Sequence, residues 1–284
     1  MNKKFSFKSY GKLNLFLRII GRKDNLHLLE MINTEITLSD EISGEIEYPG
    51  SGIIEIRMSP DYNLKNIDNL VYKTSKLYME KSNIKFDISF YIKKIIPPGS
   101  GLAGGSSNSA YTLLFLNSVF NKFSIEELID IGFNIGSDVP FFLIGGLCKV
   151  SGFGEKVTPA ENKYIGESYF LVIIPDFALS TKKVYEAYDL SMNANKDNIR
   201  DFEDFDLFPL KNDLYRPAKT INPEIEELLE DLSNTNPQGY SMTGSGSGCY
   251  AIYKNKIEVE KAFNNLKNKY KKIFIVFPKL NRNI

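Results

Sequence analysis

Residues 97–110 read Pro-Pro-Gly-Ser-Gly-Leu-Ala-Gly-Gly-Ser-Ser-Asn-Ser-Ala, a stretch with four glycines and four serines. An alternating strand pattern precedes it at residues 84–92, and a leucine-rich helix pattern follows it at residues 108–120. Glycine lets backbone N–H groups approach a ligand, and the first turn of a helix adds unpaired N–H donors and the positive end of its dipole. The stretch therefore predicts a loop that binds phosphate groups, and it suits a triphosphate.

Length and composition exclude several classes of protein. The chain has 284 residues, enough for two domains, and Lys+Arg 35 balances Asp+Glu 35. Zero net charge argues against nucleic acid or an acidic membrane as the partner, so we expect a small molecule. Cys148 and Cys249 lie far apart in apolar runs, which fits buried thiols in a reducing compartment. Without a signal core or an apolar run near ~20 residues, we expect a cytoplasmic chain with no membrane span.

Strand and helix patterns alternate along the chain. Alternation over residues 13–19 predicts a strand, and this strand places Lys12 and Asn14 on one face. The polar residues 21–27 predict a turn before further strand-like runs. Ser124 begins a capping-box pattern that opens a short helix. We expect an α+β fold.

The second half of the chain follows a polar segment that contains glycine, residues 151–163. We expect a domain boundary there and divide the chain into domains 1–157 and 158–284. A second glycine tract, residues 242–248, leads into a strand pattern. This tract is either a flexible hairpin turn or a second anion-binding nest.

Other nucleotide-binding schemes fit the first glycine stretch poorly. Residues 99–104 match the dinucleotide pattern G-x-G-x-x-G, but the preceding strand alternates, whereas a Rossmann strand is almost continuously apolar. No acidic strand end follows at the expected distance of about 20 residues. The Walker pattern is absent, as are the His-Arg-Asp and Asp-Phe-Gly motifs of protein kinases.

Residues 96–110 closely resemble the phosphate-binding motif of the GHMP small-molecule kinases, in the extended Gly-Gly-Ser-Ser-Asn form. Other stretches resemble the family in the same order along the chain: residues 12–17, 69–71, 136–142, 154–155, 180–185, 212–214 and 242–246. The resemblance implies an amino-terminal ATP-binding domain like ribosomal protein S5 domain 2. It also implies a ferredoxin-like carboxy-terminal domain on the substrate side.

The resemblance also implies an activity, ATP-dependent phosphorylation of an alcohol group with Mg²⁺. The extended motif is similar to that of members that phosphorylate the 2-hydroxyl of a cytidine diphosphate-linked methylerythritol in non-mevalonate isoprenoid synthesis. Two alternatives stay open: another kinase of the family, for homoserine or a mevalonate derivative, and a non-catalytic nucleotide- or RNA-binding protein on the same fold. We expect a monomer or a weak homodimer.

Two residues match the family's catalytic pair. Asp138 matches the aspartate that takes the proton of the acceptor hydroxyl, and Lys12 matches the lysine that orients this hydroxyl and offsets negative charge. By residue type alone, Asp138 would be a helix N-cap ahead of Pro140 and Lys12 a solvated strand lysine. The combined match favours the catalytic roles.

The resemblance also assigns the binding residues. Those expected at ATP are Pro97, Pro98, Gly99, Ser100, Gly101, Leu102, Ala103, Gly104, Gly105, Ser106, Ser107 and, near the adenine, Asn69. Those expected at the acceptor are Asn14 at the methylerythritol end, Leu26, His27 and Tyr185 at the cytosine, and Thr181, Gly244, Ser245 and Gly246. Either Ser106 or Ser107 could help to bind Mg²⁺, a hard cation that prefers oxygen ligands.

Three positions depart from the family pattern. Tyr10-Gly11 stands where the family has Pro-Ala, and the arginine before the turn at Gly154 is absent. Leu26 stands where the family has a tyrosine that stacks on the cytosine. A leucine offers an apolar face without a ring, so we predict weaker but retained cytidine binding.

Overall fold

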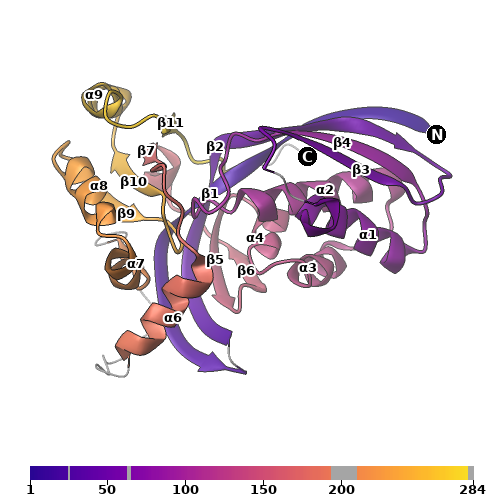
Figure 1. Cartoon of the computed structure of the whole chain (residues 1–284), viewed down its shortest axis with the longest axis horizontal. Helices are drawn as coiled ribbons and strands as arrows, with labels where there is room; N and C mark the ends of the chain where they lie inside the picture. Colours follow the sequence, from indigo (N-terminus) through magenta and orange to yellow (C-terminus); the bar gives the residue numbers. More distant parts are fainter. Residues whose placement is uncertain (25, 63–64, 193–209, 281–284) are drawn as a thin grey trace.

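The computed structural model describes residues 1–24, 26–62, 65–192 and 210–280. Within these residues it contains two sheets, each covered by helices, which lie side by side (Figure 1). The expected α+β fold is confirmed.

The first sheet belongs mainly to the amino-terminal half. Its described strands are β1 Asn2–Lys23, β2 Leu26–Glu47, β3 Ile54–Ser59, β4 Asp87–Lys93, β5 Leu147–Gly152, β6 Lys156–Pro159 and β8 Lys211–Asn212. They follow the order β3-β4-β2-β1-β8, and β5 pairs with both β2 and β6. The helices that cover it are α1 Leu70–Ser82, α2 Gly104–Phe120, α3 Ile125–Phe133 and α4 Val139–Ile144, after a short 3₁₀ turn, Asn66–Asp68.

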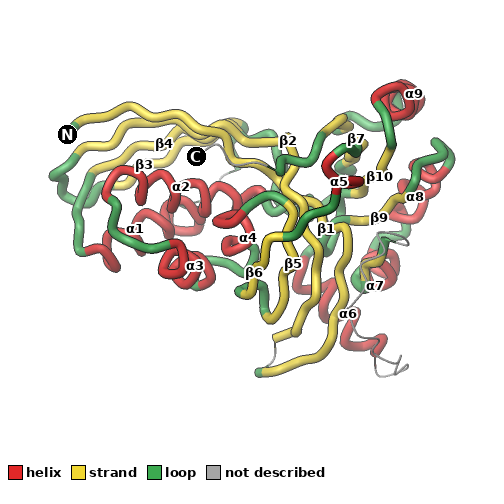
Figure 2. Tube along the Cα trace, turned by 180° about the vertical axis from the view of Figure 1, so that it is seen from behind, coloured by secondary structure: helices red, strands yellow, loops and turns green. Residues whose placement is uncertain are grey.

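The β1–β2 hairpin runs through the whole molecule. Its antiparallel ladder extends from Asn2 paired with Glu47 to Lys23 paired with Leu26, with irregularities at three places. Such bulges bend and twist a strand pair. The hairpin thus extends beyond the part of the first sheet that α1–α4 cover and ends beside α6, as Figures 1 and 2 both show.

The hairpin's turn is shorter than the sequence predicts. Most of the polar residues 21–27 belong to the strands, because pairs such as Arg22 with His27 continue the ladder. The chain reverses at Asp24, whose φ is 52°, and Asn25 lies outside the described residues. Of the strand-like runs expected after the turn, those over residues 31–38 and 41–48 form one continuous strand, β2.

Helix α2 begins directly at the glycine loop. It starts at Gly104, four residues before the predicted start at Asn108, because glycine and serine hide a helix in a pattern of apolar residues. The predicted capping box is present at α3, where the Ser124 side chain accepts from the Glu127 N–H and the Glu127 carboxylate accepts in return. Both helices pack below the first sheet (Figure 2).

The second sheet forms the carboxy-terminal half. Its described strands are β7 Tyr169–Ile173, β9 Gly239–Met242, β10 Cys249–Tyr253 and β11 Ile273–Val276, in the order β11-β7-β10-β9 and all antiparallel. The helices of this half are α5 Lys163–Gly166, α6 Thr181–Met192, α7 Tyr215–Ile221, α8 Glu224–Ser233 and α9 Lys256–Leu266. This β-α-β-β-α-β arrangement is the expected ferredoxin-like one.

The two halves share structure. The proposed division after residue 157 lies inside β6, which still pairs with β5 of the first sheet. β8 returns to pair in parallel with Phe16 and Leu17 of β1. One core cluster contains Leu17 together with Val184 and Met242 of the second half. The halves therefore pack on a common core.

Among the described residues, the helices are all too short or too polar to cross a bilayer.

Gly44 gives a test of this packing. It lies on β2 opposite Phe90 of β4, and a Cβ built on it would stand 1.8 Å from the carbonyl oxygen of Ser89. Since that atom belongs to the backbone of a paired strand, we expect Gly44→Ala to lower the free energy of unfolding by about 3 kcal/mol. Equilibrium unfolding in urea measures the loss.

Gly21→Ala is the matched control on the same hairpin. A Cβ there would meet only the Leu28 Cδ1 atom, at 3.7 Å. Its unfolding free energy should stay within about 0.5 kcal/mol of the wild type. Equal losses in the two variants would contradict the packing described for Gly44.

Candidate active site

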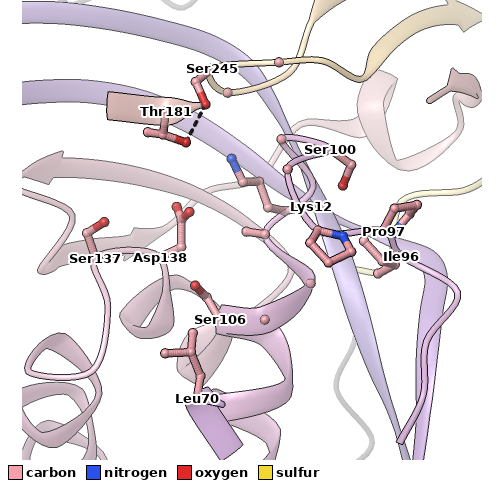
Figure 3. Close-up of a pocket in the computed structure, with 18 of the residues that line it drawn as sticks. Lys12, Leu70, Ile96, Pro97, Ser100, Ser106, Ser137, Asp138, Thr181 and Ser245 are labelled. Atoms are coloured by element: carbon pink, nitrogen blue, oxygen red, sulfur yellow. Dashed lines mark hydrogen bonds between the residues drawn. The ribbon is translucent and has the colours of Figure 1, made fainter. Parts of the chain in front are cut away.

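A cleft of about 430 Å³ opens where the glycine loop, β1 and the second half of the chain meet. Most residues expected at ATP and the acceptor line it: Lys12, Asn14, Asn69, Pro97, Pro98, Gly99, Ser100, Gly101, Ala103, Gly104, Gly105, Ser106, Asp138, Thr181, Tyr185, Gly244, Ser245 and Gly246. Side chains from elements far apart in sequence therefore surround one space (Figure 3).

The two glycine tracts contact each other directly. The N–H groups of Ser247 and Gly248 donate to the carbonyl oxygens of Gly99 and Ser100, at 3.2 and 3.0 Å. At Gly101, where φ is +75°, a Cβ would lie 2.2 Å from the carbonyl oxygen of Thr243. Only glycine allows this approach without displacing backbone. The second tract is thus fixed against the first.

The amino terminus of α2 provides an anion site. Its N-cap residue, Ala103, has φ 53° and forms no side-chain cap with any described residue. The first N–H groups of such a helix have no partner inside it and carry the positive end of its dipole. Gly104, Gly105 and Ser106, at this end, line the cleft. The arrangement can hold phosphate groups.

A buried ion pair supports the entry to the glycine loop. Asp40 on β2 is fully buried, pairs with Lys94, and accepts from the N–H groups of Ile95 and Ile96 at 2.7 and 2.9 Å. A buried carboxylate needs such partners. The sequence analysis missed this pair, because nothing in the sequence connects a strand residue with a lysine 54 positions later.

Lys12 reaches from β1 to the bottom of the cleft. Only 3 % of it is exposed, and its Nζ donates to Asn14 Oδ1. Burial lowers the pKa of Lys12, and the negative charge of Asp138 opposes part of this shift. In Figure 3, Lys12, Asp138 and Ser106 surround the same space, and Thr181 Oγ1 lies 2.9 Å from Ser245 Oγ beside them.

Asp138 occupies the N-cap position of α4, but its side chain makes no capping hydrogen bond within the described part of the chain. A purely structural cap role therefore does not account for this residue. Its carboxylate faces the cleft near Lys12 (Figure 3). Asp138 and Lys12 thus bring a proton acceptor and a cation to the same part of the cleft. This arrangement suits transfer of a charged group to a hydroxyl.

Asn14 ties β1 to the second half. Its N–H donates to Thr243 Oγ1 at 3.0 Å, and Tyr250 Oη donates to its carbonyl oxygen at 2.9 Å. These bonds fix the strand that carries Lys12. The prediction that Lys12 and Asn14 share a face is confirmed, since both line the cleft.

The residues expected at the cytosine lie in an adjoining hollow of about 520 Å³, which includes Leu26, His27, Tyr185 and Asp189. The rings of His27 and Tyr185 stand 4.7 Å apart at 31°. Tyr185 lines both spaces, so the hollow adjoins the cleft. Burial, followed by the charge of Asp138, raises the pKa of Tyr185, so its hydroxyl stays protonated.

Asp189 links the hairpin to α6. Its Oδ1 lies 2.6 Å from Nε2 of His27, and its Oδ2 accepts from Arg22 at 3.1 Å. The sequence analysis did not select this residue. Its place four residues after Tyr185, on the same helical face, is the signal that could have found it.

Two expected ATP residues lie outside the cleft. Leu102 is fully buried in a core cluster, and its carbonyl oxygen accepts from the Lys12 N–H at 3.1 Å. Ser107 is fully buried and does not line the cleft. Ser106 is therefore the serine that faces the ligand space. The described residues contain no group of three or more His, Cys, Asp or Glu side chains placed to hold a metal ion by themselves.

Family models match both halves of the chain. Residues 69–146 match the model of the GHMP kinases N terminal domain, and residues 189–272 match that of the GHMP kinases C terminal domain. A protein of Clostridium perfringens (strain 13 / Type A), named 4-diphosphocytidyl-2-C-methyl-D-erythritol kinase, is 35% identical over 277 residues, 93% of this chain and 94% of that protein. A protein of the same name from Clostridium acetobutylicum is 36% identical over 279 residues, 94% of this chain and 98% of that protein.

Solved structures share the fold. A crystal structure of 4-(cytidine 5'-diphospho)-2C-methyl-D-erythritol kinase has a TM-score of 0.75 and 24% identity, covering 97% of this chain and 100% of that one. The Methanococcus jannaschii mevalonate kinase has a TM-score of 0.69 and 15% identity, covering 98% and 99%. At these identities the likeness establishes the fold alone. The curated relatives establish more, because they are similar over nearly the whole chain, and they show that it belongs to the 4-diphosphocytidyl-2-C-methyl-D-erythritol kinase family of GHMP kinases.

Proposed function

We propose that this kinase transfers the γ-phosphoryl group of ATP to the 2-hydroxyl of 4-diphosphocytidyl-2-C-methyl-D-erythritol, a step of non-mevalonate isoprenoid synthesis. One observation carries the proposal. The cleft that holds Lys12, Asp138 and the helix terminus adjoins a hollow with His27 and Tyr185, whose rings suit a base. A phosphate site and a base site thus adjoin, as a nucleotide-linked acceptor requires.

The triphosphate lies at the α2 terminus in this proposal. Backbone N–H groups of the glycine loop and of the first helical turn donate to the phosphate oxygens. Ser100 adds a hydroxyl, since it lines the cleft and its buried Oγ has no partner among the described residues. Asn69, the N-cap of α1, lies at the same cleft and is our candidate for the adenine side.

The acceptor hydroxyl lies between Lys12 and Asp138. Asp138 takes its proton while the hydroxyl oxygen bonds to the γ-phosphorus and the bond from that phosphorus to the ADP oxygen breaks. The Lys12 ammonium donates to the oxygens that carry the growing negative charge. Burial of this lysine strengthens its electrostatic interactions, because little water screens them.

The donor set fits Mg²⁺. Ser106 offers a hydroxyl and Asp138 a carboxylate in the same cleft, and Mg²⁺ prefers one or two such ligands together with phosphate oxygens. When bound, the ion would neutralise phosphate charge. Phosphate oxygens and water would supply its other ligands.

We further propose that the enzyme acts in the cytoplasm on this small molecule, without nucleic acid, as a monomer or a weak homodimer. The zero net charge of the chain supports the absence of a nucleic-acid partner.

Asp138→Asn tests the proposed base. An amide cannot accept the proton, so we expect kcat to fall about 10²- to 10⁴-fold, with little change in the KM for ATP. A coupled assay of ADP release with the cytidine-linked acceptor measures this. Asp130→Asn, the same change on the exposed face of α3, should leave kcat unchanged. Turnover by Asp138→Asn equal to that of the wild type would refute the mechanism.

Leu26→Tyr tests the missing ring at the hairpin tip. Leu26 is 56% exposed at the hollow, so an added ring has room to stack on a base, a contact worth ~1–3 kcal/mol. We expect the Kd for cytidine diphosphate, measured by calorimetry, to fall about tenfold. Ile257→Tyr places the same ring on exposed α9 and should leave the affinity unchanged. Equal affinity of wild type and Leu26→Tyr would contradict the stacking role.

The pH dependence of kcat tests the charge of Lys12. A lysine is charged below its pKa, and burial lowers the pKa of Lys12 from 10.5, with Asp138 opposing the shift. Activity that needs the ammonium should therefore decline with rising pH earlier than an exposed lysine would allow. Lys12→Arg stays charged throughout this range, so its lower kcat should show no such decline. An identical alkaline decline in both proteins would exclude Lys12 as its source.

A further inference from the structure

Asn33 lies on β2 directly opposite Asn14 in the ladder with β1. It is fully buried and lies behind the residues that line the cleft and the hollow. Opposed residues of an antiparallel pair place their side chains on one face of the sheet. Asn33 therefore reaches the ligand space only through Asn14.

The hydrogen bonds on this face can run in one direction only. The Lys12 ammonium has donors and no acceptor, so the Asn14 atom that faces it is the oxygen, Oδ1. This orientation turns Nδ2 of Asn14 toward Asn33, whose Oδ1 accepts at 2.7 Å. The sulfur of Met31, at 3.4 Å, is a weaker second acceptor for the same Nδ2.

This direction of the hydrogen bonds leaves the Nδ2 atom of Asn33 buried and without a hydrogen-bond partner in the described part of the chain. An unpartnered buried amide destabilises the folded state, whereas an apolar side chain of similar size does not. Stability alone therefore gives no reason for an asparagine here. Its contribution is the acceptor oxygen that it presents to Asn14.

We propose that Asn33 is a positioning residue for phosphoryl transfer. Its Oδ1 holds the Asn14 amide so that the Asn14 oxygen faces Lys12 and fixes the ammonium at the reacting groups. Without this acceptor the Asn14 amide can turn over and present its N–H₂ group to the ammonium, donor against donor. The role rests on the function proposed above for Lys12.

Asn33→Leu removes the acceptor at nearly constant volume. We expect kcat to fall about tenfold, equivalent to ~1.4 kcal/mol, while the thermal midpoint of unfolding does not fall. The KM for ATP should stay within about twofold, because the groups expected at ATP are untouched. Asn33→Asp keeps an oxygen toward Asn14 and should recover most of kcat. An unchanged kcat in Asn33→Leu would overturn the proposal.

Thr34→Val is the matched control, a buried β2 residue that loses a hydroxyl bonded to the Glu35 carbonyl oxygen at 3.3 Å. It should keep the wild-type kcat. Asn33→Ala removes the same acceptor with a smaller side chain and should show the same loss in kcat. If the leucine variant does not fold, the kcat of Asn33→Ala tests the proposal in its place.

A double-mutant cycle then separates positioning from general disturbance. If Asn33 acts through Asn14, Asn33→Leu should lower kcat in the wild type and change it little in an Asn14→Ala background. Equal fold losses in both backgrounds would overturn the proposal.

Wild-type turnover tests the proposed function, and the ratio of variant to wild type tests Asn33. If the wild type uses another alcohol instead, the proposed function fails, and the same ratio measured on that alcohol still decides the role of Asn33.

Discussion

A buried ammonium group needs oxygen atoms around it, and the structure depends on meeting this need at Lys12. Transfer of a charge from water into a protein interior is costly unless the charge is paired and hydrogen-bonded. The Lys12 ammonium donates a hydrogen bond to the side-chain oxygen of Asn14, two residues along the same strand. The opposite charge that acts on it is that of Asp138 on another element. The long β1–β2 hairpin makes this possible, because it runs from the first sheet to the second half of the chain (Figure 1), and Lys12 lines the cleft between the two halves.

Phosphoryl transfer also requires the junction of the two halves to be rigid. Reacting atoms gain most from fixed geometry, and a shift of about 1 Å can cost a hundredfold in rate. Backbone hydrogen bonds between the two glycine tracts, and the bonds of Asn14 to Thr243 and Tyr250, join the halves with groups that have little freedom to move. The glycines thus allow close approach of one loop to the other, in addition to the close approach to phosphate that we propose for them.

The sequence predicts those parts of the site that depend on local order. Alternation along β1 predicts that Lys12 and Asn14 share a face, and the glycine stretch predicts the phosphate loop at the start of a helix. Partners set by strand register escape prediction, because Asp40 with Lys94 and Asn33 with Asn14 meet only once the sheet has formed. The family resemblance supplied Asp138, since residue type alone indicates a helix cap.

The donor and acceptor halves that we propose for the site differ in how they are built. On the ATP side, Lys12 and Ser100 are almost fully buried and a network of buried bonds holds the loop. On the acceptor side, Leu26 is exposed at the tip of the hairpin, and the tip meets α6 through the contacts of Asp189 with Arg22 and His27 and the ring contact of His27 with Tyr185. Phosphoryl transfer needs the same geometry for every acceptor, whereas base recognition depends on a few contacts that can vary singly. In the proposed site, the leucine at position 26 therefore lies in the half that tolerates change, apart from the reacting groups.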